Sequence, residues 1–179
     1  MPQEFPLLAR QPIFNRTMEV VAYELLYRAD HGNRAQFTDG NSASTQVLLN
    51  TFAELSIEKV VGNHRAFINF TAALMETRFP FDTSQLVIEV LESEAINANL
   101  LHQLKRLRED GFAIALDDFV LTKESAALIP YADIVKLDVL ALSDSQLTAH
   151  IKYLKPLGVQ LIAEKIETFE MLEHCRKLG

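Results

Sequence analysis

Short apolar runs alternate with polar, helix-like segments along most of the chain, and this alternation sets its expected architecture. The runs are aliphatic and β-branched, as in strands buried on both faces, and read AYELLYR, AFINF, LVIEV, AIALDDF, IVKLDV and LIAEKIE. The clearest helix is predicted over 97–110, with an apolar face formed by Leu100, Leu101, Leu104 and Leu107. Strands and helices joined by short connections predict right-handed βαβ units and a parallel sheet.

The two N-terminal runs are predicted to pair with each other in the opposite sense. LLARQPIF and VVAYELLYR flank a turn at 15–18, which indicates an antiparallel hairpin. Further helices are expected from Ser42 or Ser44 to Leu55 and over 72–77, 122–129 (ended by Pro130), 144–154 and 169–178, with a loop over 30–40. The expected fold is α/β: a modified TIM-type (β/α) barrel with a first antiparallel strand. Because such a barrel needs about eight strands, we expect it to be incomplete at its C-terminal end.

Composition narrows the class of protein without identifying it. The 179 residues, 49% hydrophobic and 23% charged, are expected to form a single domain over 1–179. A net charge of −7 argues against a nucleic-acid-binding surface, and no apolar stretch approaches the length of a membrane span. The N-terminus carries an early acid and two prolines, unlike a signal peptide, and the single Cys175 excludes an internal disulfide. These features favour a cytoplasmic location with no nucleic-acid or membrane partner.

Polar side chains lie at or near the ends of nearly all the predicted strands. They are Glu24, Asn69, Glu89, Asp117, Asp118, Lys136, Asp138, Glu164 and Glu167. Parallel strands place their C-terminal ends at one mouth of a barrel, where α/β barrels hold their chemistry. We therefore expect these side chains to converge in one polar basin.

Oxygen ligands of this kind suit a hard divalent cation such as Mg²⁺ or Mn²⁺. The expected ligands are Glu24, Asn69, Glu89 and Asp117, with Asp118 at a second metal position. Two ions about 4 Å apart would activate a water and stabilise the charge that develops on a phosphodiester. Lys136 would balance negative charge beside the metals, and Glu164 would be the base for the attacking water. No Ser-His-Asp or Cys-His arrangement competes, because the five histidines fall in predicted loops or helices and are expected to be surface or structural residues.

Each of these residues also has an ordinary structural interpretation. Glu24 could be the buried ion-pair partner of Arg28, and Lys136 could neutralise the neighbouring acids without any catalytic role. The remaining alternatives are a strand-end turn at Asn69, solvated Glu89 and Glu92, a helix cap at Asp117–Asp118, and ion pairs of Glu164 and Glu167 with Lys165 and Arg176. The ordered recurrence of all these residues, rather than any one of them, favours a site.

The same residues, in order and spacing, resemble the motifs of EAL domains. The motifs are Glu24-Leu25-Leu26, Asn69, Glu89, Asp117-Asp118-Phe119, Lys136-Leu137-Asp138 and Ala163-Glu164-Lys165-Ile166-Glu167, and the resemblance covers 11–179. It implies a modified TIM barrel with two divalent metals and the activity of a bacterial cyclic-di-GMP phosphodiesterase. The sequences QPIF at 11–14 and YELLYR at 23–28 look most like one branch of the family. In that branch a degenerate EAL-like domain is followed by an HDOD domain, and the proteins are regarded as regulatory, with little or no hydrolysis.

By position, the resemblance implies a role for each residue. The metal ligands would be Glu24, Asn69, Glu89 and Asp117, with Asp118 at the second metal. The catalytic residues would be Glu164 as general base, Lys136 as the residue that positions the water, and Glu167 in support of the site. The residues that contact the nucleotide, cyclic di-GMP, would be Arg28, Gln11 and Asp138.

Several positions depart from the pattern of the family that the chain resembles. Leu25 stands where the signature has Ala, and Lys165 stands where it has Gly, next to the expected base. The Gly-Thr-Gly-Tyr-Ser-Ser loop after Phe119 reads Val-Leu-Thr-Lys-Glu-Ser, without the glycines that supply φ > 0 positions. The closing Gln-Gly-Tyr-x-Phe strand does not occur before Gly179, so the domain is expected to be truncated relative to the family.

These departures predict a regulatory or protein-interaction module with weak or no catalysis. Mg²⁺ or Mn²⁺ is expected only if the site is functional. Two alternatives remain: a metal-dependent phosphodiesterase that hydrolyses cyclic di-GMP to the linear dinucleotide, and an effector that binds the nucleotide without turnover. The expected partners are cyclic di-GMP, a protein partner or HDOD domain, and a second copy of the chain in a homodimer.

Overall fold

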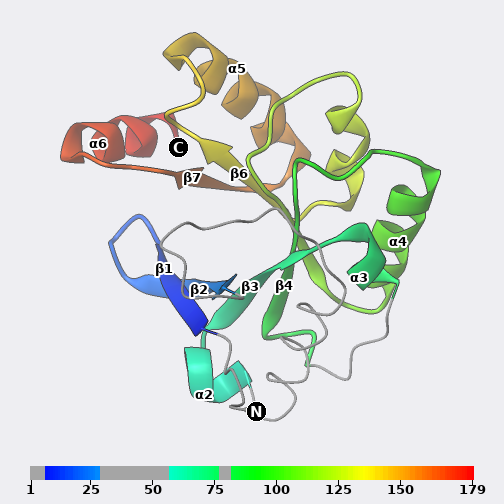
Figure 1. Cartoon of the computed structure of the whole chain (residues 1–179). Helices are drawn as coiled ribbons and strands as arrows, with labels where there is room; N and C mark the ends of the chain where they lie inside the picture. The colour runs from blue at the N-terminus through cyan, green and yellow to red at the C-terminus, as the bar shows by residue number, and fades with distance from the viewer. Residues whose placement is uncertain (1–6, 29–56, 77–81) are drawn as a thin grey trace. The chain divides into compact units, whose positions relative to one another are not determined.

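The computed structural model of the chain describes residues 7–28, 57–76 and 82–179 (Figure 1). Its strands are β1 (Leu7–Phe14), β2 (Val20–Arg28), β3 (Arg65–Phe70), β4 (Leu86–Val90), β5 (Ala113–Leu116), β6 (Ile134–Asp138) and β7 (Gln160–Glu164). Its α-helices are α2 (Ile57–Val61), α3 (Ala72–Met75), α4 (Ala98–Glu109), α5 (Asp144–Leu154) and α6 (Phe169–Leu178). Short 3₁₀ helices are η1 (Ser125–Ala127), η2 (Ile129–Tyr131) and η3 (Lys155–Leu157).

The strands are ordered along the sheet as they are in the sequence. β1 and β2 are antiparallel, whereas β2–β3, β5–β6 and β6–β7 are parallel pairs. This confirms the α/β class and the single antiparallel strand at the start. The described part of the chain contributes seven strands, where a closed (β/α)₈ barrel has eight. The chain divides into two compact units, Met1–Val87 and Ile88–Gly179, and its organisation as one domain over 1–179 stays a prediction.

The first unit is built on the β1–β2 hairpin predicted around 15–18. Asn15 organises the turn, because its side-chain oxygen accepts the backbone N–H groups of Thr17 and Glu19, each at 2.9 Å. These bonds add to the backbone turn bond from the N–H of Met18 to the carbonyl of Asn15 at 3.0 Å. An Asn side chain that bonds the backbone two residues on stabilises a turn, which is why this residue type suits the position. β2 then pairs in parallel with β3, so the hairpin and the parallel strands share β2.

The helices of the first unit match the sequence pattern only in part. α3 begins as predicted, after Thr71, whose hydroxyl accepts the backbone N–H of Leu74 at 3.3 Å. α2 (Ile57–Val61) was not predicted, and it begins beyond the expected end of the preceding helix at Leu55. The helix expected from Ser42 or Ser44 and the loop expected over 30–40 lie outside the described residues.

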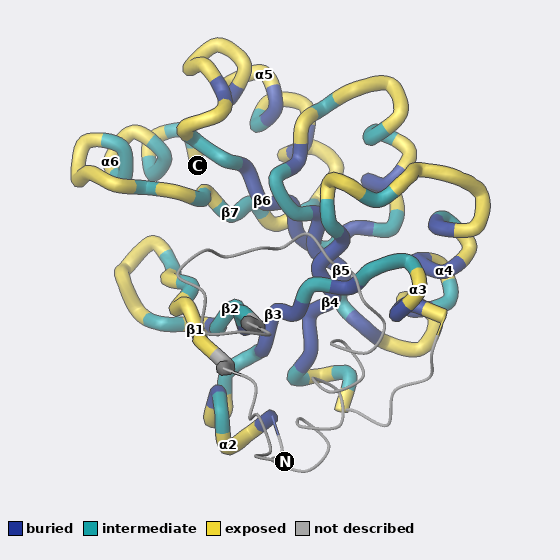
Figure 2. The backbone as a smooth tube through the Cα atoms, in the orientation of Figure 1, coloured by how far each residue is buried: buried dark blue, intermediate teal, exposed yellow. Residues whose placement is uncertain are grey.

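In the second unit, the core contains the apolar face of α4 (Figure 2). Leu100, Leu104 and Leu107 of this face are at most 1% exposed. The helix is bounded by local chemistry: the Asn97 side chain accepts the N–H of Leu100 at 3.0 Å, and Gly111 follows the last turn with φ 94°. The helix predicted over 97–110 is confirmed.

The segment over 122–129 forms two 3₁₀ helices rather than the single helix predicted there. η1 covers Ser125–Ala127 and η2 covers Ile129–Tyr131. Pro130 does not end the segment but lies in the first turn of η2, where a missing backbone N–H leaves no hydrogen bond unmade. α5 and α6 have the predicted ranges, 144–154 and 169–178.

β7 and α6 are more exposed than β4, β5 and β6 (Figure 2). No residue of α6 is buried, and β7 has only exposed and half-buried positions, whereas β4 is buried throughout. Across 7–28, 57–76 and 82–179, no helix has both the length and the apolar character needed to cross a membrane.

Candidate functional site

Three carboxylates surround the buried ammonium group of Lys136. Its Nζ lies 2.7 Å from Oε1 of Glu89, 2.6 Å from Oδ1 of Asp117 and 2.9 Å from Oε1 of Glu164. The Lys136 and Glu89 side chains are 2% and 0% exposed, and those of Asp117 and Glu164 are 15% and 17% exposed. These four residues, here the Lys136 cluster, all belong to the second unit. The structure thus brings four of the predicted site residues together.

The Lys136 cluster follows from the order of the strands. Its members are Glu89 on β4, Asp117 directly after β5, Lys136 on β6 and Glu164 at the end of β7. In the β6–β7 register, Asp138 is the Cα partner of Glu164. Since residues two apart on a strand project from the same face, Lys136 and Asp138 lie on one face with Glu164. Two acids are therefore adjacent on this face, and each is paired with a different lysine.

Negative charge exceeds positive charge in the Lys136 cluster. When all four groups are ionised, three carboxylates against one ammonium leave a formal surplus of two negative charges in a largely desolvated place. Such a surplus is costly unless further positive charge compensates it. Because carboxylate oxygens are the ligands that Mg²⁺ and Mn²⁺ prefer, these residues fit a divalent cation beside Lys136.

A second lysine, Lys165, holds two carboxylates in a more exposed place. Its Nζ lies 3.2 Å and 3.3 Å from the two carboxylate oxygens of Asp118 and donates a hydrogen bond to Oδ2 of Asp138. The other oxygen of Asp138 accepts the backbone N–H groups of Leu140 at 2.8 Å and Ala141 at 3.0 Å. The side chains of Lys165, Asp118 and Asp138, here the Lys165 cluster, are 48%, 35% and 13% exposed. All oxygens of its two acids are therefore already engaged.

Both ends of the Lys165–Asp118 ion pair have a left-handed backbone. The φ angle is 59° at Lys165 and 41° at Asp118. For a lysine this conformation costs about 1–2 kcal/mol relative to right-handed backbone, whereas Asp tolerates it better. Such positions persist where the surroundings fix them, and the ion pair is a contact that holds both.

The contacts of the Lys165 cluster shift its pKa values. The hydrogen bond to Asp138 raises the pKa of Lys165 above its usual range, with a further contribution from Asp118, although burial opposes this. Burial alone would raise the pKa of Asp138, but the hydrogen bonds from Lys165 and from the backbone N–H groups of Ala141 and Leu140 outweigh it and lower that pKa. Lys165 and Asp138 are therefore both charged at neutral pH.

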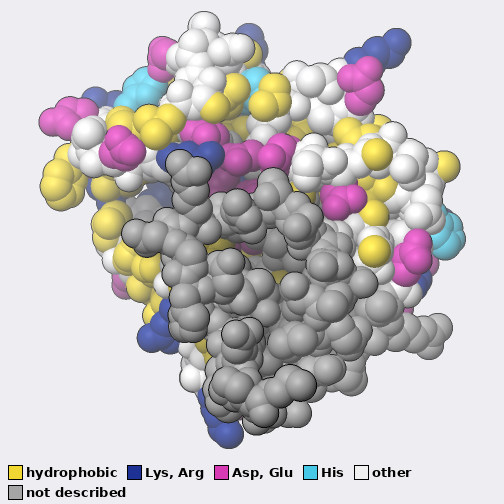
Figure 3. Space-filling model, in the orientation of Figure 1, with side chains coloured by type: hydrophobic (Ala, Val, Ile, Leu, Met, Phe, Trp, Pro, Cys, Tyr) yellow, Lys and Arg dark blue, Asp and Glu magenta, His cyan; other side chains and the backbone are white. Residues whose placement is uncertain are grey.

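Glu92 joins Asp117 and Asp118 in a further group of acids, whose carboxylate oxygens lie within 4.8 Å of one another. Figure 3 shows acidic side chains gathered beside a basic side chain on the face in view. A group of three carboxylates at this spacing suits a divalent cation. Asp117 and Asp118 were predicted as metal ligands, but Glu92 was not. The sequence signal that could have indicated Glu92 is its place two positions after the buried strand β4, because Asp117 and Asp118 follow β5 in a similar way.

The remaining predicted ligands lie in the first unit. Glu24 on β2 is half-buried and is the Cα partner of Gln11 on β1, so a predicted metal ligand and a predicted nucleotide contact are neighbours. Oδ1 of Asn69, on β3, is buried and has no hydrogen-bond partner among the described residues. A buried amide oxygen of this kind fits a cation ligand. The side chain of Arg28 lies outside the described part of the chain, and the convergence of these residues with the Lys136 cluster stays a prediction.

Two of the structural alternatives are wrong. Glu89 is fully buried rather than solvated, because β4 places it in the interior beside Lys136. Asp117 and Asp118 do not cap the next helical segment, whose N-cap position is Glu124. Glu167 is exposed, and its supporting role stays a prediction. Among the ion pairs, Glu164 pairs with Lys136, Lys165 with Asp118 and Asp138, and Arg176 with Glu173, and the expected pairs of Glu164 and Glu167 with Lys165 and Arg176 stay predictions.

The loop after Phe119 is ordered by side-chain hydrogen bonds rather than by glycine. Ser125 Oγ accepts the N–H of Thr122 at 2.8 Å, and Thr122 Oγ1 accepts the N–H of Ser125 at 3.0 Å. The N–H of Leu121 donates to Nε2 of the buried His150 at 2.8 Å, which gives this histidine the structural role expected of it. Within 119–125, which the structure describes completely, no residue has a positive φ. The loop therefore takes a path that needs none of the glycines missing from its sequence.

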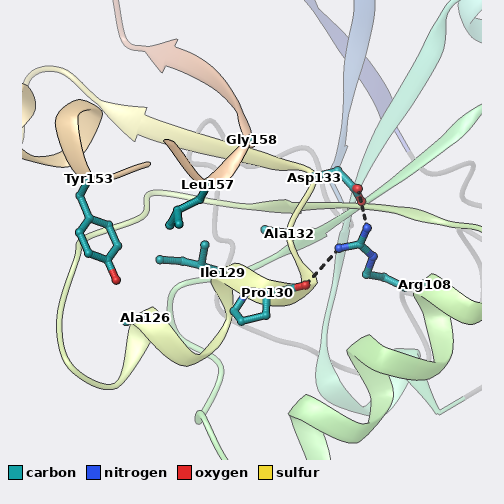
Figure 4. Close-up of a pocket in the computed structure, with 9 residues that line it drawn as sticks. All are labelled: Arg108, Ala126, Ile129, Pro130, Ala132, Asp133, Tyr153, Leu157 and Gly158. Atoms are coloured by element: carbon teal, nitrogen blue, oxygen red, sulfur yellow. Dashed lines mark hydrogen bonds and ion pairs between the residues drawn. The ribbon is translucent and has the colours of Figure 1, made fainter. Parts of the chain in front are cut away.

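An open hollow of about 470 Å³ lies elsewhere in the second unit (Figure 4). Ile129 and Tyr153 line it with apolar surface. Its one cation is already engaged, because the Arg108 guanidinium donates to a carboxylate oxygen of Asp133 at 3.1 Å and to the carbonyl of Pro130 at 3.2 Å. None of its lining residues is a predicted site residue. The two lysine clusters, rather than this hollow, form the candidate site.

Comparison with known proteins assigns a family to these residues. A sequence model of the EAL domain matches residues 7–179 of the chain. The chain is similar to the uncharacterized protein YuxH of Bacillus subtilis, at 39% identity over 168 residues that cover 90% of this chain and 41% of YuxH. It is also similar to the cyclic di-GMP phosphodiesterase CdgJ of Vibrio cholerae, at 29% identity over 177 residues that cover 96% of this chain and 41% of CdgJ. The chain thus spans about two fifths of the length of these curated relatives.

A solved structure shows the fold. The Bacillus subtilis YkuI protein, which has an EAL domain and was crystallised with its substrate c-di-GMP and calcium, superimposes with a TM-score of 0.74. The match covers 97% of this chain and 51% of YkuI at 23% sequence identity. At this identity the likeness concerns the fold alone, and it confirms the predicted modified (β/α) barrel.

Proposed function

Since this chain belongs to the EAL domain family, we propose that it is a signalling domain of the cyclic-di-GMP system that turns the nucleotide over weakly or not at all. The observation that carries the proposal is the loop after Phe119. Its Thr122–Ser125 hydrogen bonds and the absence of positive φ over 119–125 give it a different path from a glycine-rich loop. A loop that shapes the site differently supports regulation rather than catalysis.

The Lys136 cluster contains the residues that would do the chemistry in an active member. A divalent cation, when bound, would supply an activated water and stabilise charge on the phosphodiester. Glu89 and Asp117 would hold it, Lys136 would fix their carboxylates, and Glu164 would accept the proton of the water. Oε1 of Glu164 lies 2.9 Å from Nζ of Lys136, and this ion pair competes with a proton donated by the water. This engagement supports slow turnover.

Two further functions have specific support. Hydrolysis of cyclic di-GMP to the linear dinucleotide is favoured by the complete Lys136 cluster and by the similarity to CdgJ, which is named as a phosphodiesterase. Binding of cyclic di-GMP without turnover is favoured by the shared fold of YkuI, which binds that nucleotide. In either case Gln11, Arg28 and Asp138 are the proposed contacts to the nucleotide.

Partners and location are part of the same proposal. The chain spans about two fifths of its curated relatives, which is consistent with a further domain, such as HDOD, in the whole protein. A second copy of the chain or another protein would receive the signal through the outer helices. A cytoplasmic location fits the single Cys175. Mg²⁺ or Mn²⁺ is the proposed cofactor.

Chromatography of cyclic di-GMP incubated with the chain and Mn²⁺ tests the proposal, with the full-length gene product run in parallel. We expect the cyclic nucleotide to remain intact or to be consumed no faster than with Glu164→Gln. Rapid conversion to the linear dinucleotide that is abolished in Glu164→Gln would establish the phosphodiesterase instead. Binding heat in calorimetry without conversion would identify the effector.

A further inference from the structure

The Lys165 cluster contains a cation that belongs to the chain itself. Asp118 and Asp138 present carboxylates that both contact one Nζ, which lies 3.2 Å and 3.3 Å from the oxygens of Asp118. Two carboxylates brought this close need positive charge between them, and in metal sites a divalent ion supplies it. Here the ammonium group of Lys165 does so.

We propose that Lys165 is a tethered counter-ion that replaces a divalent cation between Asp118 and Asp138, so that this pair of acids binds no metal of its own. Both oxygens of Asp138 are used, one by Lys165 and the other by the N–H groups of Leu140 and Ala141. A metal ion bound to both acids would lie about 2.1 Å from their oxygens and would overlap the ammonium group. The metal therefore has to displace Lys165, which stays nearby as a repelling charge.

A second metal ion bound by Asp118 and Asp138, as the position predicted at Asp118 would require, does not fit beside Lys165. The Asp118 carboxylate also lies close to those of Glu92 and Asp117, and the spacing of these three acids is compatible with a single cation. Such a cation and Lys165 would compete for Asp118. Because the Lys136 cluster and this group share Asp117, they provide one ion position between them, and the chain is expected to bind one divalent ion there and none between Asp118 and Asp138.

The backbone at Lys165 allows a clean variant. Its φ of 59° is a conformation that glycine adopts without strain, so Lys165→Gly removes the ammonium group and relieves the backbone at the same position. The variant is therefore expected to fold. Lys105→Ala on α4 removes the same charge from an exposed helix position, where the side chain is 65% exposed and pairs with Glu109 at 3.9 Å.

Equilibrium dialysis against Mn²⁺, with metal and protein quantified in the retained sample, tests the inference without any nucleotide. We expect about one Mn²⁺ per chain for the unmodified protein and for Lys105→Ala, and a gain of about one further ion for Lys165→Gly. Adding Asp138→Asn to Lys165→Gly should abolish the gain, and Lys165→Arg should behave as the unmodified protein.

Four outcomes would overturn the inference. They are a second ion already bound with Lys165 in place, no gain in Lys165→Gly, an equal gain in Lys105→Ala, and a gain that survives Asp138→Asn. The inference deepens the proposed function at the same site but does not depend on the rate of hydrolysis. Fast turnover would overturn the proposed function and leave the ion count unchanged. A second ion bound to the unmodified protein would overturn the inference about Lys165 and leave the proposed function standing.

Discussion

The Lys136 and Lys165 clusters are both ion pairs between one lysine and several carboxylates, but they differ in burial. Each joins one lysine to carboxylates that lie near the end of a strand or directly after it. The side chain of Lys136 is 2% exposed and that of Lys165 is 48% exposed. Losing a buried partner leaves an uncompensated charge in a poorly solvated place, whereas an exposed pair exchanges its contacts for water at little cost. The buried cluster is therefore a fixed framework, and the exposed one is an ion pair whose loss costs the fold little.

The largest difference between the clusters should appear when their lysines are removed. Lys136→Met strands the fully buried carboxylate of Glu89, and we expect the free energy of unfolding at pH 7 to fall by about 3–5 kcal/mol. Urea denaturation measures this. Lys105→Met, at an exposed position on α4, should change the value by no more than about 0.5 kcal/mol. A loss below about 1 kcal/mol for Lys136→Met would show that the cluster is not the buried framework described here.

Divalent cations should stabilise the chain by compensating the surplus charge of the acids around Asp117. At a free Mn²⁺ concentration 100 times the dissociation constant, the gain is about 2.7 kcal/mol, visible as a higher midpoint of thermal unfolding than with a chelator present. Asp117→Asn removes a charge from both the Lys136 cluster and the Glu92 group and should lose most of this gain. An undiminished gain in Asp117→Asn would place the ion elsewhere.

The exposed cluster should contribute a pH-dependent stabilisation that depends on Asp138. Because the pKa of Asp138 is lowered from its usual 3.8, its ionised form stabilises the fold above that pH, and the contribution is lost as the pH falls through the lowered pKa. Asp138→Asn should cost about 1 kcal/mol at pH 7, the scale of one partly exposed ion pair, and the deficit should shrink below about pH 4. Urea denaturation of both proteins across this range provides the test. A deficit that is constant with pH would contradict the assigned ion pair.

The smallest effect should come from Lys165→Gly in the absence of divalent cations. Loss of a partly exposed ion pair costs about 0–1 kcal/mol, and relief of the left-handed backbone returns about 1 kcal/mol, so the net change should be below about 1 kcal/mol. Lys165→Ala loses the same ion pair but keeps a Cβ at φ 59°, and should be the less stable variant by denaturation. An alanine variant as stable as the glycine variant would contradict the backbone strain assigned to position 165.

Elements determined by local patterns were predictable from the sequence. α4 follows from its leucine spacing and its Asn97 cap, and the hairpin follows from two apolar runs around an Asn turn. The segment over 122–129 was not, because Pro130 permits a second 3₁₀ turn as readily as it ends a helix. Apolar periodicity does not distinguish the two outcomes.

The candidate site also contains residues that the sequence predicts and residues that it does not. Glu89, Asp117, Lys136 and Glu164 lie on strands or directly after them, and parallel pairing alone brings such positions together. Glu92 and Lys165 lie in connections after strands, whose paths depend on tertiary contacts. The reach of Lys165 to Asp118 and Asp138 also depends on a left-handed backbone at a residue type that rarely adopts it. Sequence spacing therefore indicates the buried cluster but not its exposed counterpart.

Anomalous diffraction from crystals of the chain grown with Mn²⁺ tests most directly whether Lys165 occupies the place of a cation. We expect a manganese peak beside Asp117, no peak between Asp118 and Asp138, and the Lys165 ammonium group within hydrogen-bonding distance of both. A manganese ion coordinated jointly by Asp118 and Asp138, with Lys165 turned away, would contradict the account.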